Sequence, residues 1–248
     1  MDIENIKAEF IRYVDDYFEN KDISAVYVNL KEDHSFRVAS IMEKLARDMK
    51  LNEDEIKLSY VIGLLHDIGR FRQKLIETKN PKLKLDHADE GVKILFEEGF
   101  INKLNIPNMY HNIIKYAVKN HNKYKIEDKL SDKELFFAKL IRDADKIDIF
   151  RVSFIYHPSK IVENKFDKNL LKDFYNSKNI KLNKNKLDSS YILVTLSFIF
   201  DLNYKESITY LKELKFYEKY INTLKPTEDN TTQFKKVIDF SLESLYKL

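Results

Sequence analysis

The sequence predicts an all-α fold, and two observations support this prediction. Glycine and proline number only four each among 248 residues, and no alternating run of β-branched residues indicates a strand or a hairpin. Apolar residues instead recur with the spacing of one helix face from one end of the chain to the other. Because 44% of the residues are apolar, such helices can bury a substantial core.

The predicted helices have recognisable beginnings and ends. Asp33 and Asn52 stand where N-cap residues would begin the second and third helices, and the third is expected to end at Gly69. Gly99 suits the left-handed position that ends a helix, and Ser131-Asp-Lys-Glu134 has the pattern of a capping box. In chain order we expect helices near 2–19, from 33 onward, at 52–69, 87–98, 107–121 and 131–154, and in segments after 166 that include 190–202 and 231–247.

A single domain spanning residues 1–248 is the economical prediction, because no internal repeat and no low-complexity linker interrupts the chain. The residues that carry chemistry lie at about 30–155. The helical patterns at about 166–248 are expected to pack as a C-terminal helical extension, within which the polar segment 177–188 is predicted to be an exposed loop.

Composition and charge exclude several classes of protein. Cysteine is absent, so any metal must be held by His, Asp or Glu rather than by thiolates. The 43 basic and 40 acidic residues are interspersed, which predicts no dedicated nucleic-acid surface. The start of the chain is acidic where a signal peptide needs basic residues, and the apolar stretch 191–200 is far shorter than the roughly 20 residues that span a bilayer. We therefore expect a cytoplasmic protein without a membrane partner.

Polar residues on apolar helix faces are the first indication of a functional site. His34 is in phase with the apolar residues of its helix and should face the interior, and the pair His66-Asp67 directly follows the apolar run 61–65. Taken singly, each has a structural explanation, namely a hydrogen-bonded interior histidine or an aspartate that closes a helix. Their accumulation on inward faces favours a shared site.

The long helix after Ser131 adds a carboxylate. With about 100° of rotation per residue, Asp145 lies roughly 40° from the buried Ile141, whereas Asp143 lies roughly 160° away and is expected to face water. Asp148 shares the inward phase and could orient a ligand histidine. A buried carboxylate needs a cation or several donors, so an inward aspartate opposite inward histidines predicts a metal site.

The remaining histidines offer further nitrogen ligands. His121 lies in the apolar stripe of its helix, and His87 opens the helix before it, so both could reach a common interior point. His111 falls at the edge of the stripe and is a reserve candidate. His157, which precedes a proline, is expected in a loop.

Three segments together resemble the HD superfamily of metal-dependent phosphohydrolases. They are Asp33-His-Ser-Phe-Arg-Val38, Gly63-Leu-Leu-His-Asp-Ile-Gly-Arg70 and Ile141-Arg-Asp-Ala-Asp-Lys-Ile147, which match the ordered pattern H…HD…D of that family over about 30–155. The resemblance implies a single-domain helical HD-type fold.

The resemblance also assigns metal ligands. It implies that the first divalent ion is held by four residues: His34, His66, Asp67 and Asp145. Family members with two ions add histidines between the HD pair and the final aspartate, and His87 and His121 occupy those places here. In such members the aspartate of the HD pair, here Asp67, bridges both ions.

The reaction that the resemblance implies is hydrolysis of a phosphate mono- or diester, with a nucleotide-like substrate, by a metal-activated water. One or two ions of Mn, Fe, Co, Ni, Zn or Mg suit such ligands. Arg37, Arg70 and Lys74 are placed to bind phosphate oxygens, with a solvated surface position as the alternative for each. Lys146 is predicted either to contact substrate or to lie beside Asp145.

Other functions stay open at the level of sequence. No Gly-Tyr-Pro segment and no nucleotidyltransferase domain is present, which argues against cyclic di-GMP turnover and alarmone synthesis. A di-iron oxygenase of the HD type acting on a polyol or phosphonate would use the same ligands and would depend on iron and oxygen. A non-catalytic nucleotide-binding module is a third reading, and a purely interacting helical protein leaves the inward polar residues unexplained. A symmetric homodimer is a further expectation.

Overall fold

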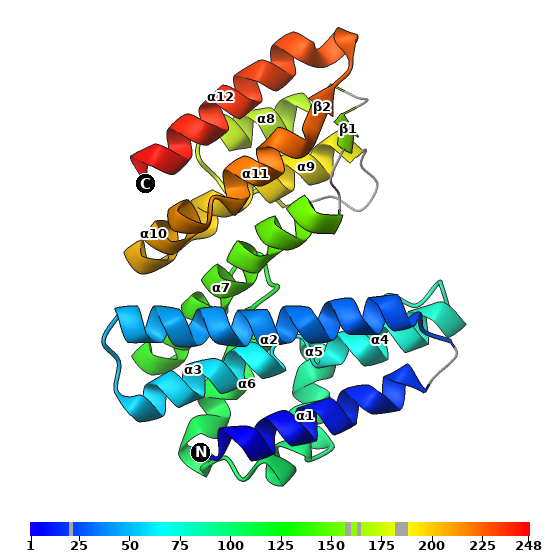
Figure 1. Cartoon of the computed structure of the whole chain (residues 1–248), viewed down its shortest axis with the longest axis vertical. Helices are drawn as coiled ribbons and strands as arrows, with labels where there is room; N and C mark the ends of the chain where they lie inside the picture. The colour runs from blue at the N-terminus through cyan, green and yellow to red at the C-terminus, as the bar shows by residue number, and fades with distance from the viewer. Residues whose placement is uncertain (20–21, 157–159, 163–164, 182–187) are drawn as a thin grey trace. The chain divides into compact units, whose positions relative to one another are not determined.

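The computed structural model describes the chain except for residues 20–21, 157–159, 163–164 and 182–187 (Figure 1). The described part is dominated by helices, so the prediction of an all-α fold is confirmed. Its strands are β1 (Lys160–Val162) and β2 (Leu224–Pro226), which pair in parallel with Lys160 opposite Leu224. The predicted loop 177–188 falls partly outside the described residues. None of the described helices is both long and apolar enough to cross a membrane.

The helices have the following bounds in chain order. They are α1 (Ile3–Phe18), α2 (Ala25–Asp48), α3 (Glu53–Leu65), α4 (Gly69–Lys79), α5 (His87–Val92), α6 (His111–Asn120), α7 (Asp132–Tyr156), α8 (Lys168–Tyr175), α9 (Asp188–Ser197), α10 (Lys205–Leu214), α11 (Phe216–Thr223) and α12 (Thr231–Lys247). A π-helical turn, η1 (Lys93–Glu97), continues α5, and short 3-10 turns lie at η2 (Phe100–Leu104), η3 (Asn108–Tyr110), η4 (Phe198–Asp201) and η5 (Glu228–Asn230).

The chain forms two compact units, Met1–Asp145 and Lys146–Leu248, and each is described by itself. Helix α7 contains the boundary between them. The prediction of one domain with an extension from about residue 166 stays a prediction, and the unit boundary lies about 20 residues before that point.

In the first unit, α2 and α3 pack side by side in an antiparallel pair, joined by the turn 49–52 (Figure 1). Their backbones approach closely at Gly63, where an added Cβ atom would lie 2.5 Å from the Cα atom of Ala39. A side chain at position 63 would therefore push the two helices apart. The close approach brings the C-terminal end of α3 beside the middle of α2, where His34 lies.

Several predicted helix ends are confirmed by their hydrogen bonds. Asn52 accepts a hydrogen bond from the backbone N–H of Glu55 at 3.0 Å, as an N-cap residue does. The capping box is present, because Glu134 accepts from the N–H of Ser131 at 2.8 Å and its own N–H donates to the Ser131 hydroxyl at 3.4 Å. Gly99 adopts the left-handed conformation, with φ of 76°.

Two predicted boundaries are wrong. The second helix begins at Ala25, with Ser24 as its N-cap, and not near Asp33. Val28 is buried, but Lys31 and Glu32, one turn later, interrupt the apolar pattern before His34. The third helix ends at Leu65 rather than at Gly69, where α4 begins instead. The turn 66–68 joins the two helices, and α4 packs closely against α5. An added Cβ atom at Gly69 would lie 2.1 Å from the backbone oxygen of the first residue of α5.

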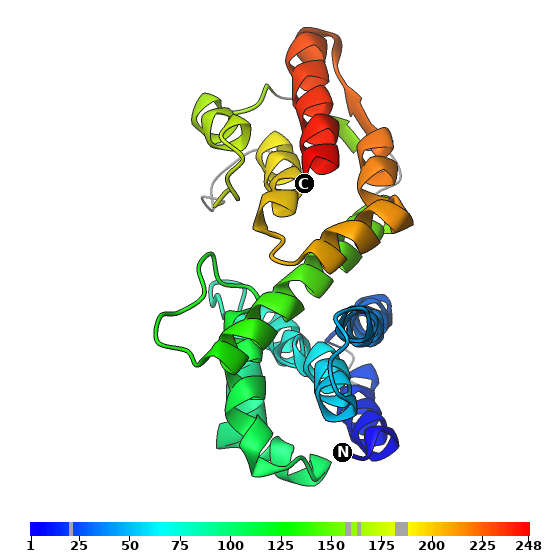
Figure 2. The same cartoon turned by 90° about the vertical axis from the view of Figure 1, so that its left-hand side faces the viewer.

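The second unit holds helices α8 to α12, coloured from yellow-green to red in Figure 2. Its core includes Phe150, whose ring packs edge-on against that of Tyr217 with 5.0 Å between the centroids. The Tyr217 hydroxyl donates to the backbone oxygen of Leu196 at 3.2 Å. Asn230, directly before α12, donates to the backbone oxygen of Val162 at 2.6 Å and so ties this helix to β1.

Candidate metal centre

The six side chains predicted as metal ligands lie together in the first unit. They come from five places in the fold: His34 from the middle of α2, His66 and Asp67 from the turn that follows α3, His87 from the start of α5, His121 from the residue that follows α6, and Asp145 from α7. Their sequence separations reach 111 residues. The tertiary structure therefore assembles this cluster from short local segments.

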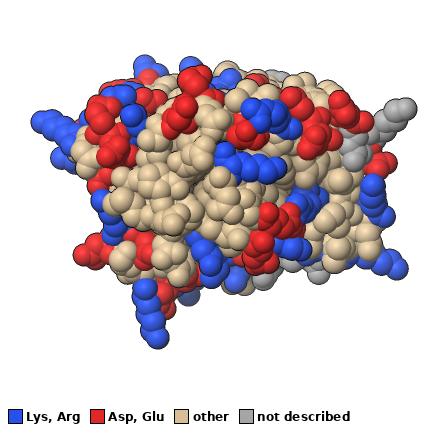
Figure 3. All heavy atoms as spheres, turned by 90° about the horizontal axis from the view of Figure 1, so that it is seen from below, with Lys and Arg blue, Asp and Glu red and all other residues tan. Residues whose placement is uncertain are grey.

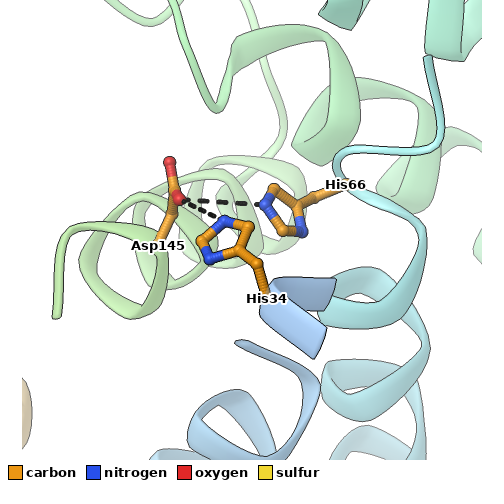
Figure 4. Close-up of side chains that lie close together, drawn as sticks. All are labelled: His34, His66 and Asp145. Atoms are coloured by element: carbon orange, nitrogen blue, oxygen red, sulfur yellow. Dashed lines mark hydrogen bonds and ion pairs between the residues drawn. The ribbon is translucent and has the colours of Figure 1, made fainter. Parts of the chain in front are cut away.

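The first group comprises His34, His66 and Asp145, whose ligand atoms all lie within 4.8 Å of one another (Figure 4). Nε2 of His34 is 3.1 Å from Oδ1 of Asp145, and Nε2 of His66 is 3.8 Å from the same oxygen. Both rings point their Nε2 atoms toward this carboxylate. His66 is fully buried, whereas the side chain of Asp145 keeps 15% of its surface exposed. The group thus has a closed inner side and a more open outer side.

Asp67 lies between the first group and the two remaining histidines. Its Oδ2 atom is 3.9 Å from Nε2 of both His34 and His66. Its Oδ1 atom is 3.3 Å from Nε2 of His87 and 3.4 Å from Nε2 of His121. The two oxygens of one buried carboxylate therefore face two different pairs of histidine nitrogens.

The hydrogen bonds of two histidines fix which nitrogen is available to a metal. Nδ1 of His66 is 2.7 Å from the backbone oxygen of Gly63, and Nδ1 of His121 is 2.7 Å from that of Val118. A carbonyl oxygen can only accept, so each Nδ1 carries the proton and each Nε2 has a lone pair directed into the cluster. Nε2 of His66 is buried and has no hydrogen-bond partner among the described residues. A bound cation would satisfy this atom.

The electrostatics of the cluster suit a divalent cation. Burial lowers the pKa of His66 to about 4 and that of His87 to about 2, although neighbouring carboxylates oppose the shift. Both rings are therefore neutral at pH 7, as metal ligands must be. Burial opposes ionisation of Asp67, yet Lys31, Arg70 and His66 hold its pKa well below the ordinary value. The neutral imidazoles of His66 and His87 and the ionised carboxylate of Asp67 suit the ions that nitrogen and oxygen ligands bind.

Of the predicted phosphate-binding residues, the structure brings Arg70 to the cluster. Its Nε atom is 3.3 Å from Oδ1 of Asp67, and 31% of its side-chain surface is exposed. The ammonium of Lys74 lies 5.5 Å from the centre of the Tyr27 ring.

The two other predicted cations lie beside carboxylates outside the cluster. The guanidinium of Arg37 is 3.6 Å from Asp33, one helical turn before it on α2. Lys146 belongs to the second unit, where its Nζ atom is 2.8 Å from Oδ2 of Asp201. This ion pair gives Lys146 a structural partner within its own unit.

Lys31 is a cation of the cluster that the sequence analysis missed. Its Nζ atom lies 3.2 Å from Oδ2 of Asp67, and its side chain is 20% exposed. It precedes His34 by three residues on α2, so the two share a helix face. The spacing of three residues indicates a shared face only if both residues are helical, and the predicted helix began near Asp33, after Lys31.

Four other predictions concern residues outside the set of six predicted ligands. The prediction that Asp143 faces water is wrong, because Asp143 is fully buried. Residues 140–144 of α7 are covered around most of the helix circumference apart from Asp145 itself, so a wheel with one buried face does not apply there. Asp148 lies 4.0 Å from Arg151 within the second unit. His111 is 3.0 Å from the backbone oxygen of Ile106, outside the cluster, and His157 lies outside the described residues.

The fold and the cluster define a helical protein whose His and Asp side chains are arranged to hold metal ions. Residues 32–149 match the family described as HD domain. Residues 32–149 therefore form an HD domain, and the resemblance predicted from the sequence is confirmed over this part of the chain. HD domains bind divalent metals and are associated with hydrolase chemistry. The comparisons with curated proteins and with solved structures gave no match.

Proposed function

We propose that this protein is a metal-dependent phosphohydrolase that cleaves a phosphate mono- or diester of a small, nucleotide-like substrate. The observation that carries the proposal is the position of Asp67 between two sets of nitrogen ligands, with the buried and unpartnered Nε2 atom of His66 directed into the same space. A divalent ion bound there would activate a water molecule and polarise a phosphoryl oxygen.

The ligands divide into two sets that share Asp67. The first ion would be held by His34, His66, Asp67 and Asp145, and the second by Asp67, His87 and His121. Three protein ligands leave coordination positions for water or substrate at the second ion. The exposed part of the Asp145 side chain marks the side from which a substrate could enter.

Two partly exposed cations beside the buried carboxylate support an anionic substrate. Lys31 approaches one oxygen of Asp67 and Arg70 approaches the other. Both side chains are long and end at the edge of the cluster, so each can turn toward a phosphate oxygen without a change in the backbone. Burial raises the pKa of Tyr27 to about 12, and the charges of Arg70 and Asp67 act on the same hydroxyl. The ammonium of Lys74 lies 5.5 Å from the centre of the Tyr27 ring and adds a further positive charge there.

The surface in Figure 3 interleaves basic and acidic side chains on the face that it shows, with no continuous field of one sign among the described atoms. This face therefore supports a small substrate better than a long polyanion such as nucleic acid. A cytoplasmic location and a symmetric homodimer complete the proposal, and light scattering of the purified protein would test the dimer.

The test combines metal analysis with turnover. The purified protein is dialysed against each of Mn²⁺, Fe²⁺, Co²⁺, Ni²⁺, Zn²⁺ and Mg²⁺, and phosphate or phenolate release is measured from p-nitrophenyl phosphate, bis(p-nitrophenyl) phosphate and nucleoside monophosphates. The Asp67→Ala variant should lose both metal and turnover. The matched control is Asp54→Ala, which removes an exposed carboxylate from the first turn of the same helix and should leave both unchanged.

The outcomes separate the proposed reaction from its rivals. Metal-dependent hydrolysis that Asp67→Ala abolishes would support a phosphohydrolase. Two irons per chain with oxygen uptake on a polyol or phosphonate, and no hydrolysis, would contradict it in favour of an oxygenase. Metal binding that raises the melting temperature without turnover on any substrate would instead favour a non-catalytic module.

A further inference from the structure

Arg142 is a buried cation of α7 whose guanidinium reaches the turn that carries His121. The residue is only 3% exposed. Its Nη1 atom donates to the backbone oxygens of Asn120 at 3.0 Å and His121 at 3.5 Å, and also to that of Lys123. These oxygens follow the C-terminal end of α6, where carbonyl groups have no partner inside the helix. A guanidinium in this place satisfies them and complements the negative end of the helix dipole.

The same turn is closed from its other side by Asn120, which is 1% exposed. The Asn120 amide nitrogen donates to the backbone oxygen of Tyr116 at 2.9 Å, and the amide oxygen accepts from the N–H of Glu127 at 2.9 Å. Two buried side chains therefore fix the backbone on both sides of His121. The ring of His121 has little freedom left, because its Nδ1 atom is held by Val118.

The turn also reaches His87, through the side chain of Lys123. The Lys123 ammonium lies 2.7 Å from a carboxylate oxygen of Asp86 and 3.0 Å from one of Asp89. Asp86 is the N-cap of α5 and accepts from the N–H of Ala88 at 2.9 Å. His87 is the first residue of that helix. A chain of contacts thus leads from Arg142 to both nitrogen ligands that face Oδ1 of Asp67.

We propose that Arg142 is a positioning residue for the second metal ion. It lies three residues before Asp145 on α7, so the helix that supplies a carboxylate to the first group also fixes His121 and His87. The inference rests on the metal centre of the proposed function and not on the reaction carried out there. Loss of an outer partner of a metal ligand lowers metal affinity by about 10–100-fold, and here the loss falls on the second ion.

The test measures Mn²⁺ binding by the full-length protein. Wild type, Arg142→Met, Arg142→Lys and the control Arg151→Met, which removes a guanidinium further along the same helix, are titrated with Mn²⁺ and analysed for bound metal. Electron paramagnetic resonance distinguishes a coupled pair of manganese ions from a single ion. Millimolar guanidinium chloride, far below denaturing concentration, is added to Arg142→Met as chemical rescue.

We expect about two ions in wild type and in Arg151→Met. Arg142→Met should retain the first ion and bind the second at least 10-fold more weakly, with the signal of a single manganese ion. Arg142→Lys or added guanidinium should restore part of the second affinity. This partial rescue would not occur if the variant were merely misfolded.

Three results would overturn the inference. Arg142→Met and Arg142→Lys could both bind two ions as wild type does, or both could lose the two ions together with their helical circular dichroism. Wild type could also bind a single ion, which would leave a one-metal hydrolase possible but no second ion to position. Conversely, selective loss of the second ion in a protein that hydrolyses no phosphate ester would support the inference and contradict the proposed reaction.

Discussion

A methyl group added at Gly69 should remove the second metal ion. Gly69 begins α4, and an added Cβ atom would lie 2.1 Å from the backbone oxygen of His87 and 2.5 Å from the backbone nitrogen of Gly91. Ordinary van der Waals contact of a Cβ atom begins at 3.4 Å. The added Cβ atom would therefore be about 1.3 Å too close to the His87 oxygen, and the backbone of α5 would have to move. Both clashing atoms belong to the main chain, and rotation of a side chain cannot relieve the overlap.

The expected consequence follows from the tolerance of metal sites. A metal-ligand distance varies by only about 0.2 Å. His87 is the first residue of α5, the helix that the added Cβ atom would push away. Gly69→Ala should therefore lose the nitrogen of His87 as a ligand while the first group keeps its geometry. Overpacking of this kind destabilises proteins by about 1–3 kcal/mol, which a folded variant of this size can tolerate.

The assay is metal analysis after dialysis against Mn²⁺, together with urea denaturation of the same samples. Gly91→Ala is the matched control, because its added Cβ atom would meet a methyl group of Val118 at 3.2 Å and no backbone atom closer than 3.6 Å. We expect about two ions in the control and about one in Gly69→Ala. A folded Gly69→Ala variant that binds two ions with wild-type affinity would refute the reasoning.

Three further predictions concern the charges of the cluster. With metal removed, the free energy of unfolding should fall by about 2 kcal/mol between pH 7 and pH 5 through His66 alone. Burial lowers the pKa of His66 from about 6.5 to about 4, so in this pH range the unfolded chain takes up a proton that the folded protein does not. Urea titrations at pH 7, 6 and 5 would measure the decrease, and a stability that does not change with pH would contradict the prediction. Lys31→Met should destabilise the metal-free protein by about 1–2 kcal/mol, since Asp67 loses a counter-charge, and should destabilise the Mn²⁺-bound protein less. The control Lys44→Met, on the same helix beside the exposed Asp48, should change stability by less than about 0.5 kcal/mol in either condition. Equal effects of Lys31→Met with and without metal would contradict the role of Lys31 as a counter-charge to Asp67. Mn²⁺ at about 100 times its Kd should raise the stability of wild type by about 2.7 kcal/mol per site, a gain that a chelator should reverse and that should be absent in Asp67→Ala.

The candidate ligand residues could be predicted from the sequence because each obeys a local rule. His34 follows the apolar phase of its helix, and the pair His66-Asp67 ends an apolar run, so their inward direction depends on residues a few positions away. The capping box at Ser131 is local in the same way. Local periodicity and capping therefore led to the correct fold class and to residues that the structure brings together.

The features that could not be predicted from the sequence depend on contacts between distant segments. Helix α3 ends at Leu65, and Gly69 four residues later packs against the start of α5, a contact that no rule for a single helix contains. Asp143 is buried because α7 is enclosed on several sides, whereas a helix wheel assumes one wet face. Lys31 was missed because Asp33 resembles an N-cap, so the predicted helix began two residues after Lys31.

The charges of the cluster bear on the choice between a phosphate ester and a neutral polyol as substrate. Asp67 and Asp145 carry two negative charges, and Lys31 and Arg70 balance them at the edge of the cluster. Each divalent ion held by neutral imidazoles then adds two positive charges that the protein side chains of the cluster do not offset. In a buried site such an excess is unfavourable until an anion enters, because the effective dielectric constant there is low. A phosphate group supplies one or two negative charges, whereas a neutral polyol supplies none, so the charge balance favours a phosphate ester over a polyol as the substrate.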